Sequence, residues 1–249
     1  MNRVLLALAT ALVASLATAQ QKVFDWTEGA QNEEAGKLNR LTTSFDNNTQ
    51  RFTMRANFGA VPGTNLKTDG FWVALSGGAN PKGHGGELAL LYFDATGETP
   101  TLTAYNYNGV DGNTSYRDGS PEAGDQAPDR IKSSLLDISW INDIQAFDEA
   151  DGSRTMRFDI DATEINSHNP AYPGNSPWTG LAYGDQVGIW FHHTAGSSFA
   201  YQDGFIDSFG FAKQGWLDLQ NQGTTTVPEP ATLAALGLGV AAFFKRRRA

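Results

Sequence analysis

Three acidic residues lie close together in a segment that reads as one strand. Residues Arg154–Ala162 alternate between apolar and polar side chains, as a half-buried strand does. Asp159 and Asp161 fall on the polar face, and Glu164 follows two residues after the segment. Hydrolysis of a glycosidic bond with retention of configuration needs two carboxyl groups about 5–5.5 Å apart, which same-face positions on a strand supply. The simpler interpretation is a set of solvent-facing carboxylates opposite an apolar face.

The order of these residues resembles a catalytic motif of laminarinase-like glycosidases, Glu-x-Asp-x-x-Glu. In this sequence the stretch reads Asp159-Ile160-Asp161-Ala162-Thr163-Glu164. The resemblance implies a nucleophile at the first position and an acid/base at Glu164. Asp159 departs from the motif, because its side chain is one methylene shorter and would draw a nucleophile back from the sugar. The alternative that this leaves open is a divergent hydrolase in which Asp159 or Asp161 acts with Glu164.

Acidic turns offer hard oxygen ligands of the kind that calcium prefers. They are Asp111 with Asn113, and Asp148 with Asp151. Neither has the spacing of an EF-hand, and Asp and Asn are frequent in turns because they bond their own backbone. A structural calcium ion is the one cofactor that the sequence suggests. The adjacent pair His192-His193 points to opposite faces of a strand, so it predicts no shared metal.

Aromatic side chains favour ligand binding over catalysis. Trp178, Tyr172 and Tyr183 flank a loop at 169–180, where flat rings would stack on sugar faces. Trp72 and Trp190 lie in apolar strands, and we expect them to pack in the core, since Trp is largely buried on average.

The elements expected to carry these residues are short strands, and no long helical periodicity is present. Glycine, asparagine and aspartate turns between short strands in about 200 residues predict an all-β fold, a single β-sandwich that is jelly-roll-like. Its architecture resembles the concanavalin-like lectins and glucanases. The segment 134–144 reads as either a strand or a short helix, and 112–129 as a long surface loop. The predicted strands are 51–58, 71–76, 87–93, 101–107, 154–162, 187–193 and 205–211.

The charge of the chain excludes one class of partner. Its formal net charge is -9. Five of its 18 basic residues lie in the two ends, which leaves 13 against 27 acidic residues, or about −14 for the remainder. Such a surface repels nucleic acid, because it offers few cations to displace phosphate counterions. The sequence has no Cys, so core burial or bound ions must hold the fold together.

The N-terminal residues 1–19 have the three parts of a secretory signal peptide. Arg3 supplies the positive start, an apolar run covers 4–16, and Ala17-Thr18-Ala19 is an A-x-A cleavage signature before Gln20. We therefore expect the exported domain to begin at Gln20 and to cover residues 20–222.

The C-terminal residues 223–249 read as a short linker followed by a membrane segment. Pro228-Glu229-Pro230 precedes an apolar stretch of 14 residues, 231–244, and then the cluster Lys245, Arg246, Arg247 and Arg248. As a transmembrane helix the stretch would span about 21 Å, short of the roughly 30 Å hydrocarbon core, so flanking residues or local thinning must complete the span. The basic cluster would stay cytoplasmic and the preceding residues outside.

This order of Pro-Glu-Pro, apolar helix and terminal basic cluster resembles the PEP-CTERM sorting signal. The resemblance implies export in a Gram-negative-type bacterium and processing near Pro228-Glu229-Pro230 by an exosortase-type enzyme. It also implies a membrane-anchored precursor, then a place at the cell surface or in the extracellular matrix, in a setting of exopolysaccharide and biofilm.

Together these features favour a non-catalytic surface or matrix protein that binds extracellular polysaccharide. The two alternatives are the divergent glycoside hydrolase above and a purely structural adhesion or matrix component. In all three, the partners are the processing enzyme and, before processing, the membrane.

Overall fold

A computed structural model of the full chain describes residues 20–82, 88–107, 114–118, 127–171, 177–181 and 183–228. The expected signal peptide, the residues from Glu229 onward, and the candidates Asp111, Asn113 and Tyr172 lie outside these ranges. No helix within the described ranges is long and apolar enough to cross a membrane.

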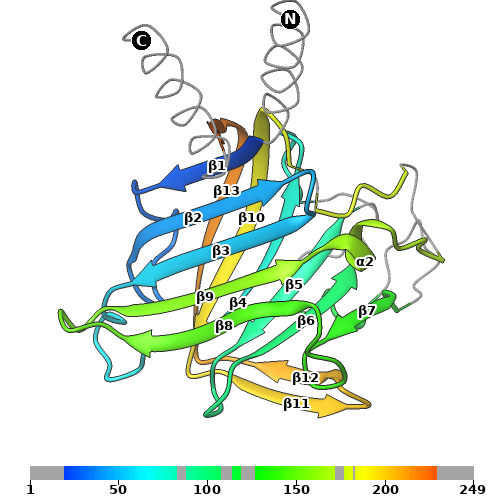
Figure 1. The fold of residues 1–249 in the computed structure, drawn as a ribbon. Helices are drawn as coiled ribbons and strands as arrows, with labels where there is room; N and C mark the ends of the chain where they lie inside the picture. Colours follow the sequence, from blue (N-terminus) through cyan, green and yellow to red (C-terminus); the bar gives the residue numbers. More distant parts are fainter. Residues whose placement is uncertain are drawn as a thin grey trace, which may run out of the picture.

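Two six-stranded antiparallel sheets form the body of the fold (Figure 1). The first sheet, sheet A, has the strand order β14-β1-β2-β3-β9-β8. Its strands are β1 (Gln20–Trp26), β2 (Leu38–Asp46), β3 (Arg51–Phe58), β8 (Ile141–Asp148), β9 (Arg154–Asp161) and β14 (Thr225–Pro228).

The second sheet, sheet B, has the order β13-β10-β4-β5-β6-β7 and lies behind sheet A in Figure 1. A separate two-stranded hairpin, β11–β12, and one short helix, α2 (Thr163–Asn166), complete the described elements. The strands are β4 (Thr68–Ser76), β5 (Ala89–Asp94), β6 (Thr101–Asn106), β7 (Arg130–Ser133), β10 (Gln186–Ala195), β11 (Ser198–Gln202), β12 (Phe205–Gly210) and β13 (Lys213–Gly223).

The main core lies between the two sheets, as the sequence pattern predicts. In β3 every second residue from Phe52 to Phe58 is buried, and β9 buries Met156, Phe158 and Ile160. Phe158 of sheet A stacks on Phe71 of sheet B, with ring centroids 6.3 Å apart. Apolar faces of two sheets packed against each other in this way define a β-sandwich, so this prediction is confirmed.

A second apolar core lies on the other face of sheet B, beneath the β11–β12 hairpin. Trp72, Trp190 and Tyr92 point to this side and pack with Phe205 and Phe209 of the hairpin. Both tryptophans are fully buried, which confirms the prediction that they are core residues. The central strands β4 and β5 are therefore buried on both faces, in agreement with the apolar runs at 71–75 and 89–93.

Two segments and five strands differ from the sequence predictions. The stretch 134–144 is neither one strand nor a helix: β8 begins at Ile141, and the residues before it form turns that expose Leu135, Leu136 and Ile138. Trp140, by contrast, is buried in the main core, and Ile141 and Ile144 pack against it. The segment expected as a linker forms β14, whose Thr225 and Val227 pair with β1. The strands β1, β2, β7, β11 and β13 were not predicted, since they lack a strict alternation or a long apolar face.

Candidate functional site

The outer face of sheet A is polar and stays open to solvent. Alternation in β2, β3, β9 and β8 turns one side chain in two away from the core. Cross-strand register then lines these side chains up in rows across the sheet. One row runs Thr42, Arg55, Arg157, Gln145, and the next runs Ser44, Thr53, Asp159, Asp143.

A hollow of about 360 Å³ lies over these two rows. A smaller hollow of about 270 Å³ adjoins it, lined by Arg40, Thr42, Arg55 and Asn57. Because the two share Arg40, Thr42 and Arg55, they form one depression, which we call the sheet A hollow. Its polar lining residues are Arg40, Thr42, Thr53, Arg55, Asn57, Asp143, Arg157 and Asp159.

Each arginine of the hollow is held by a carboxylate. Arg40 donates from Nε and Nη2 to the two oxygens of Asp25, at 2.8 and 2.6 Å. The hydrogen bond from Arg40 lowers the pKa of the Asp25 carboxyl. Arg157 lies 3.0 Å from Asp143 and also donates to the side chain of Gln145 at 2.9 Å. These forks fix the direction of planar guanidinium groups on an exposed surface.

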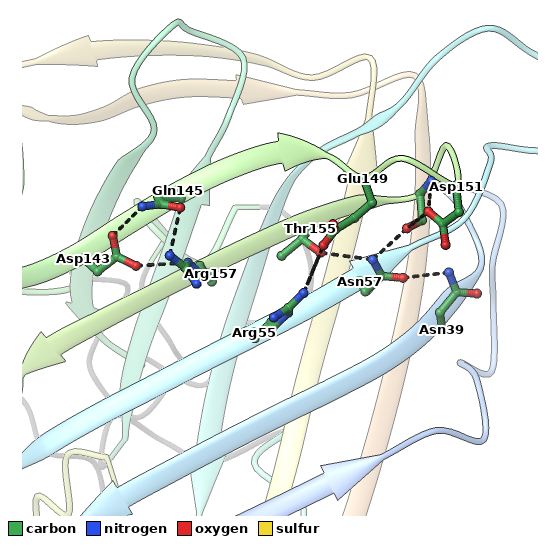
Figure 2. A network of polar contacts seen from close by, with 10 residues as sticks. Asn39, Arg55, Asn57, Asp143, Gln145, Glu149, Asp151, Thr155 and Arg157 are labelled. Carbon is green, nitrogen blue, oxygen red and sulfur yellow. Dashed lines mark hydrogen bonds and ion pairs between the residues drawn. The ribbon is translucent and has the colours of Figure 1, made fainter.

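A chain of polar contacts that extends to the β8–β9 turn holds Arg55 (Figure 2). Glu149 follows β8 in the turn and accepts hydrogen bonds from Arg55 Nη2 at 3.0 Å and from the Thr155 hydroxyl at 2.8 Å. Asn57 donates to Thr155 at 3.1 Å and to Ser153 at 2.9 Å. The side chains around the hollow thus support one another, which reduces the conformational entropy lost on binding a ligand.

The structure distributes the three candidate carboxylates among separate partners. Asp159 lines the hollow and is paired with Arg51 through both of its oxygens, with a further contact from Asn142 at 3.1 Å. Asp161 accepts a hydrogen bond from the backbone N–H of Thr163 at 2.9 Å.

Glu164 does not lie on the strand, because β9 ends at Asp161 and the chain turns into α2. Its carboxylate pairs with Lys132 of β7 at 2.9 Å, so Asp159 and Glu164 face different elements. The single strand that the laminarinase-like motif requires is therefore absent here.

Sequence reasoning missed another carboxylate of the hollow, Asp143. It stands directly opposite Asp159 across the β8–β9 pair. The only signal lay in the segment 134–144, whose ambiguity between strand and helix gave no assignment of faces. Once β8 is known to start at Ile141, period-two alternation places Asp143 and Gln145 together on the polar face.

The two aromatic candidates within the described ranges, Trp178 and Tyr183, do not line the hollow. Trp178 packs against the main core, its Nε1 donates to the backbone carbonyl of Ile165 at 3.0 Å, and its ring lies edge-on to His168. Tyr183 is 8% exposed, and its hydroxyl donates to the backbone carbonyl of Thr43 at 3.1 Å. Its ring is therefore part of the core rather than a platform at the surface.

The described acidic turn is occupied by cations and backbone contacts. Asp148 pairs with Lys67 and, at 3.2 Å, with Arg154. Asp151 accepts hydrogen bonds from the backbone and hydroxyl of Ser153, which is its role in the β8–β9 turn. In the part of the chain that the structure describes, no group of three or more His, Cys, Asp or Glu residues is placed to hold a metal ion.

Comparison with known families identifies the C-terminal segment. A family model described as the PEP-CTERM protein-sorting motif matches residues 226–248. The match covers Pro228-Glu229-Pro230, the apolar run and the basic cluster. The chain is thus an exported protein with a PEP-CTERM sorting motif, the kind of signal that an exosortase-type enzyme processes. The motif begins inside β14, so the sorting signal starts at the edge of sheet A.

A search of curated proteins and a search of solved structures each found no match to the chain.

Proposed function

We propose that this protein is a non-catalytic component of the cell surface or extracellular matrix that binds extracellular polysaccharide on the outer face of sheet A. In this proposal the signal peptide is removed after Ala19, and the apolar segment 231–244 holds the precursor in the membrane until processing near Pro228-Glu229-Pro230. We also propose that the strands of the sandwich have a jelly-roll-like arrangement and that the domain is lectin-like, as the sequence suggests.

The observation that carries the proposal is the sheet A hollow. It is a depression on an open sheet face, and its lining mixes fixed donors, fixed acceptors and hydroxyls that do both. Guanidinium groups only donate, carboxylates only accept, and threonine hydroxyls do either. A sugar ring presents neighbouring hydroxyls that need such mixed partners. The volume of about 360 Å³ falls in the range of small-ligand sites, roughly 300–1,000 Å³.

A second candidate function, glycoside hydrolysis, is favoured by the opposed pair Asp143 and Asp159. Directly opposed residues have Cβ atoms about 4.5–5.5 Å apart, close to the spacing that a retaining mechanism uses. However, both carboxylates are paired with arginines, Asp143 with Arg157 and Asp159 with Arg51. If the wild type releases reducing sugar and Asp143→Asn does not, glycoside hydrolysis rather than binding alone would be the function.

Binding is tested by filling the hollow. Thr53 stands in its second row, and Thr53→Trp places a large ring there whatever the charge of the sugar. The matched control is Gln220→Trp, an exposed position on the edge strand β13 of the other sheet. In affinity electrophoresis of the full chain, purified in detergent, through gels containing soluble polysaccharides, we expect Thr53→Trp to lower retention at least tenfold and Gln220→Trp to leave it unchanged.

The opposite results reject the proposal. Equal retention of both variants would place binding elsewhere, and no retention of the wild type on any polysaccharide would leave the purely structural role. The intact mass of the exported protein tests the processing: we expect the mature chain to start at Gln20 and to end near Pro228.

A further inference from the structure

We propose that the sheet A hollow binds an anionic sugar, with the acidic group of the polysaccharide held between Arg40 and Arg55. This inference rests on the proposed polysaccharide binding and adds the chemical class of the sugar. Three independent features of the outer face of sheet A support it.

The first feature is the distribution of charge. The chain is strongly acidic, yet five of the seven arginines between residues 20 and 228 lie on three adjacent strands, β2, β3 and β9. The smaller part of the hollow is lined by Arg40, Thr42, Arg55 and Asn57, without a carboxylate. An anionic ligand approaching an otherwise repulsive surface meets its complementary potential at this place.

The second feature is a pair of like charges. Arg55 of β3 and Arg157 of β9 are direct cross-strand partners. Like charges directly opposite each other destabilise a sheet. Their own carboxylates, Glu149 and Asp143, lie on the β8 side of these two arginines. An anion in the hollow on the other side of Arg55 would offset the remaining repulsion.

The third feature is the hydrogen-bonding capacity that the arginines retain. A guanidinium has five N–H donors. The hydrogen bonds of Arg55 to Glu149 and Thr155 both use Nη2, and Arg40 binds Asp25 through Nε and Nη2. The two side chains are 52% and 59% exposed. Carboxylate and sulfate oxygens suit such donors, because charge-assisted bonds to guanidinium are short and strong.

The remaining lining residues suit the sugar ring itself. The side chains of Thr42 and Asn57 lie beside the two arginines, and Thr53 and Asp143 lie in the wider part of the hollow. These neutral and acidic acceptors are placed for hydroxyl groups rather than for a second anion. The geometry therefore predicts one acidic group per bound sugar unit, with hydroxyls directed toward β8.

The test compares acidic with neutral polysaccharides, including one pair with the same backbone. Polygalacturonate and its methyl-esterified form share one backbone, and neutral β-glucan and dextran sulfate complete the set. Binding is measured on the full chain in detergent at low and at physiological salt. We expect polygalacturonate or dextran sulfate to bind at least tenfold more tightly than the neutral polymers, and added salt to weaken that binding by screening.

Variants assign the effect to the hollow. Arg55→Gln is expected to weaken binding of the acidic polymer roughly tenfold, the loss of a charge-assisted bond. Arg55→Lys keeps the charge but loses the fork, so we expect an intermediate loss. Arg117→Gln is the control, because Arg117 is similarly exposed, at 57%, and pairs with its sequence neighbour Asp118.

The outcomes distinguish the anionic site from polysaccharide binding in general. Preference for dextran sulfate over polygalacturonate would support the anionic site and identify sulfate as the group. Equal binding of dextran sulfate, polygalacturonate and the neutral polymers, or equal effects of Arg55→Gln and Arg117→Gln on binding of the acidic polymer, would overturn the anionic site while leaving polysaccharide binding in place. Failure of every polymer to bind would overturn both.

Discussion

Two adjacent histidines in β10 lie on opposite sides of sheet B, His193 buried and His192 half-buried. His193 faces the main core, where its Nε2 donates to the backbone carbonyl of Gly36 at 2.9 Å and its ring lies 5.1 Å from that of Phe58. His192 stacks on Trp72 at 4.7 Å in the second core. Burial lowers the pKa of His193 to about 4 and that of His192 to about 3. Because the unfolded chain binds these protons near pH 6.5, acid favours unfolding.

We therefore predict that the free energy of unfolding is largest above pH 6.5 and falls between pH 6.5 and about 4. The expected loss is about 1.4 kcal/mol per pH unit for each buried neutral histidine. Urea unfolding at pH 7.5, 6 and 5 measures it. We expect His193→Gln to have a lower unfolding free energy than the wild type at pH 7.5. The dependence of that free energy on pH should be weaker, by the amount that corresponds to the uptake of about one proton. A variant with the wild-type slope would show that His193 takes up its proton in the folded state.

At the scale of residues, period-two alternation predicts which side chains face inward, but not what lies above the outward ones. Phe52, Met54 and the opposite orientations of the two histidines follow from alternation alone. The burial of Tyr183 does not, because it depends on contact with Thr43, 140 residues earlier in the chain. Asp143 can be placed in the hollow only once the register of β8 is known.

At the scale of elements, β14 changes where the folded domain ends. It pairs with β1 through Gln20↔Pro228 to Val23↔Thr225. Lys22 of β1 donates to the Thr226 hydroxyl at 2.8 Å and pairs with Asp185 at 2.6 Å. Proline suits an edge strand because it lacks a backbone N–H. Gln20, where the proposed mature chain starts, and the start of the sorting motif are thus neighbours in one sheet.

Chains that end at Gly223 and at Pro228, both starting at Gln20, test this pairing. Removing β14 leaves β1 as an unprotected edge, and exposed edges promote association between chains. We expect the shorter chain to lose about 1–2 kcal/mol of unfolding free energy, from a few backbone and side-chain hydrogen bonds, and to self-associate more in sedimentation velocity. Equal stability and equal sedimentation would return residues 223–228 to the role of a linker.

The strands that sequence reasoning found and missed differ in how they are buried. β3 and β9 alternate because each has one face in the core and one in solvent. β4 and β5 have consecutive apolar residues at their centres because sheet B is covered there on both sides. β13 is a polar edge strand in which only Gly215, Leu217 and Leu219 are buried. β2 breaks alternation with four consecutive buried residues at its end. Edges and rims therefore carry the weakest local signal.

At the scale of the whole molecule, the two sheets have unlike outer faces. The outer face of sheet B is closed by the β11–β12 hairpin over aromatic residues, whereas the outer face of β2, β3, β9 and β8 carries the sheet A hollow. These four strands lie at the front of the molecule in Figure 1. In the described ranges, aromatic rings thus serve mainly to hold layers together, and charged planar groups form the accessible depression. Stability and ligand binding should therefore respond to different substitutions.

Phe209 tests this separation. Its ring stacks on Phe199 at 4.4 Å and meets Trp72 edge-on at 5.7 Å, so it fastens the hairpin to sheet B. Truncating a buried Phe to Ala costs about 3–5 kcal/mol. We expect Phe209→Ala to lower unfolding free energy by about 3 kcal/mol, near the smaller value because the hairpin lies at the surface, and to leave retention on polysaccharide unchanged below its melting temperature. Thr53→Trp should show the reverse. Loss of retention in Phe209→Ala while the protein remains folded would mean that the hairpin side of sheet B, rather than the arginine-lined face of sheet A, meets the ligand.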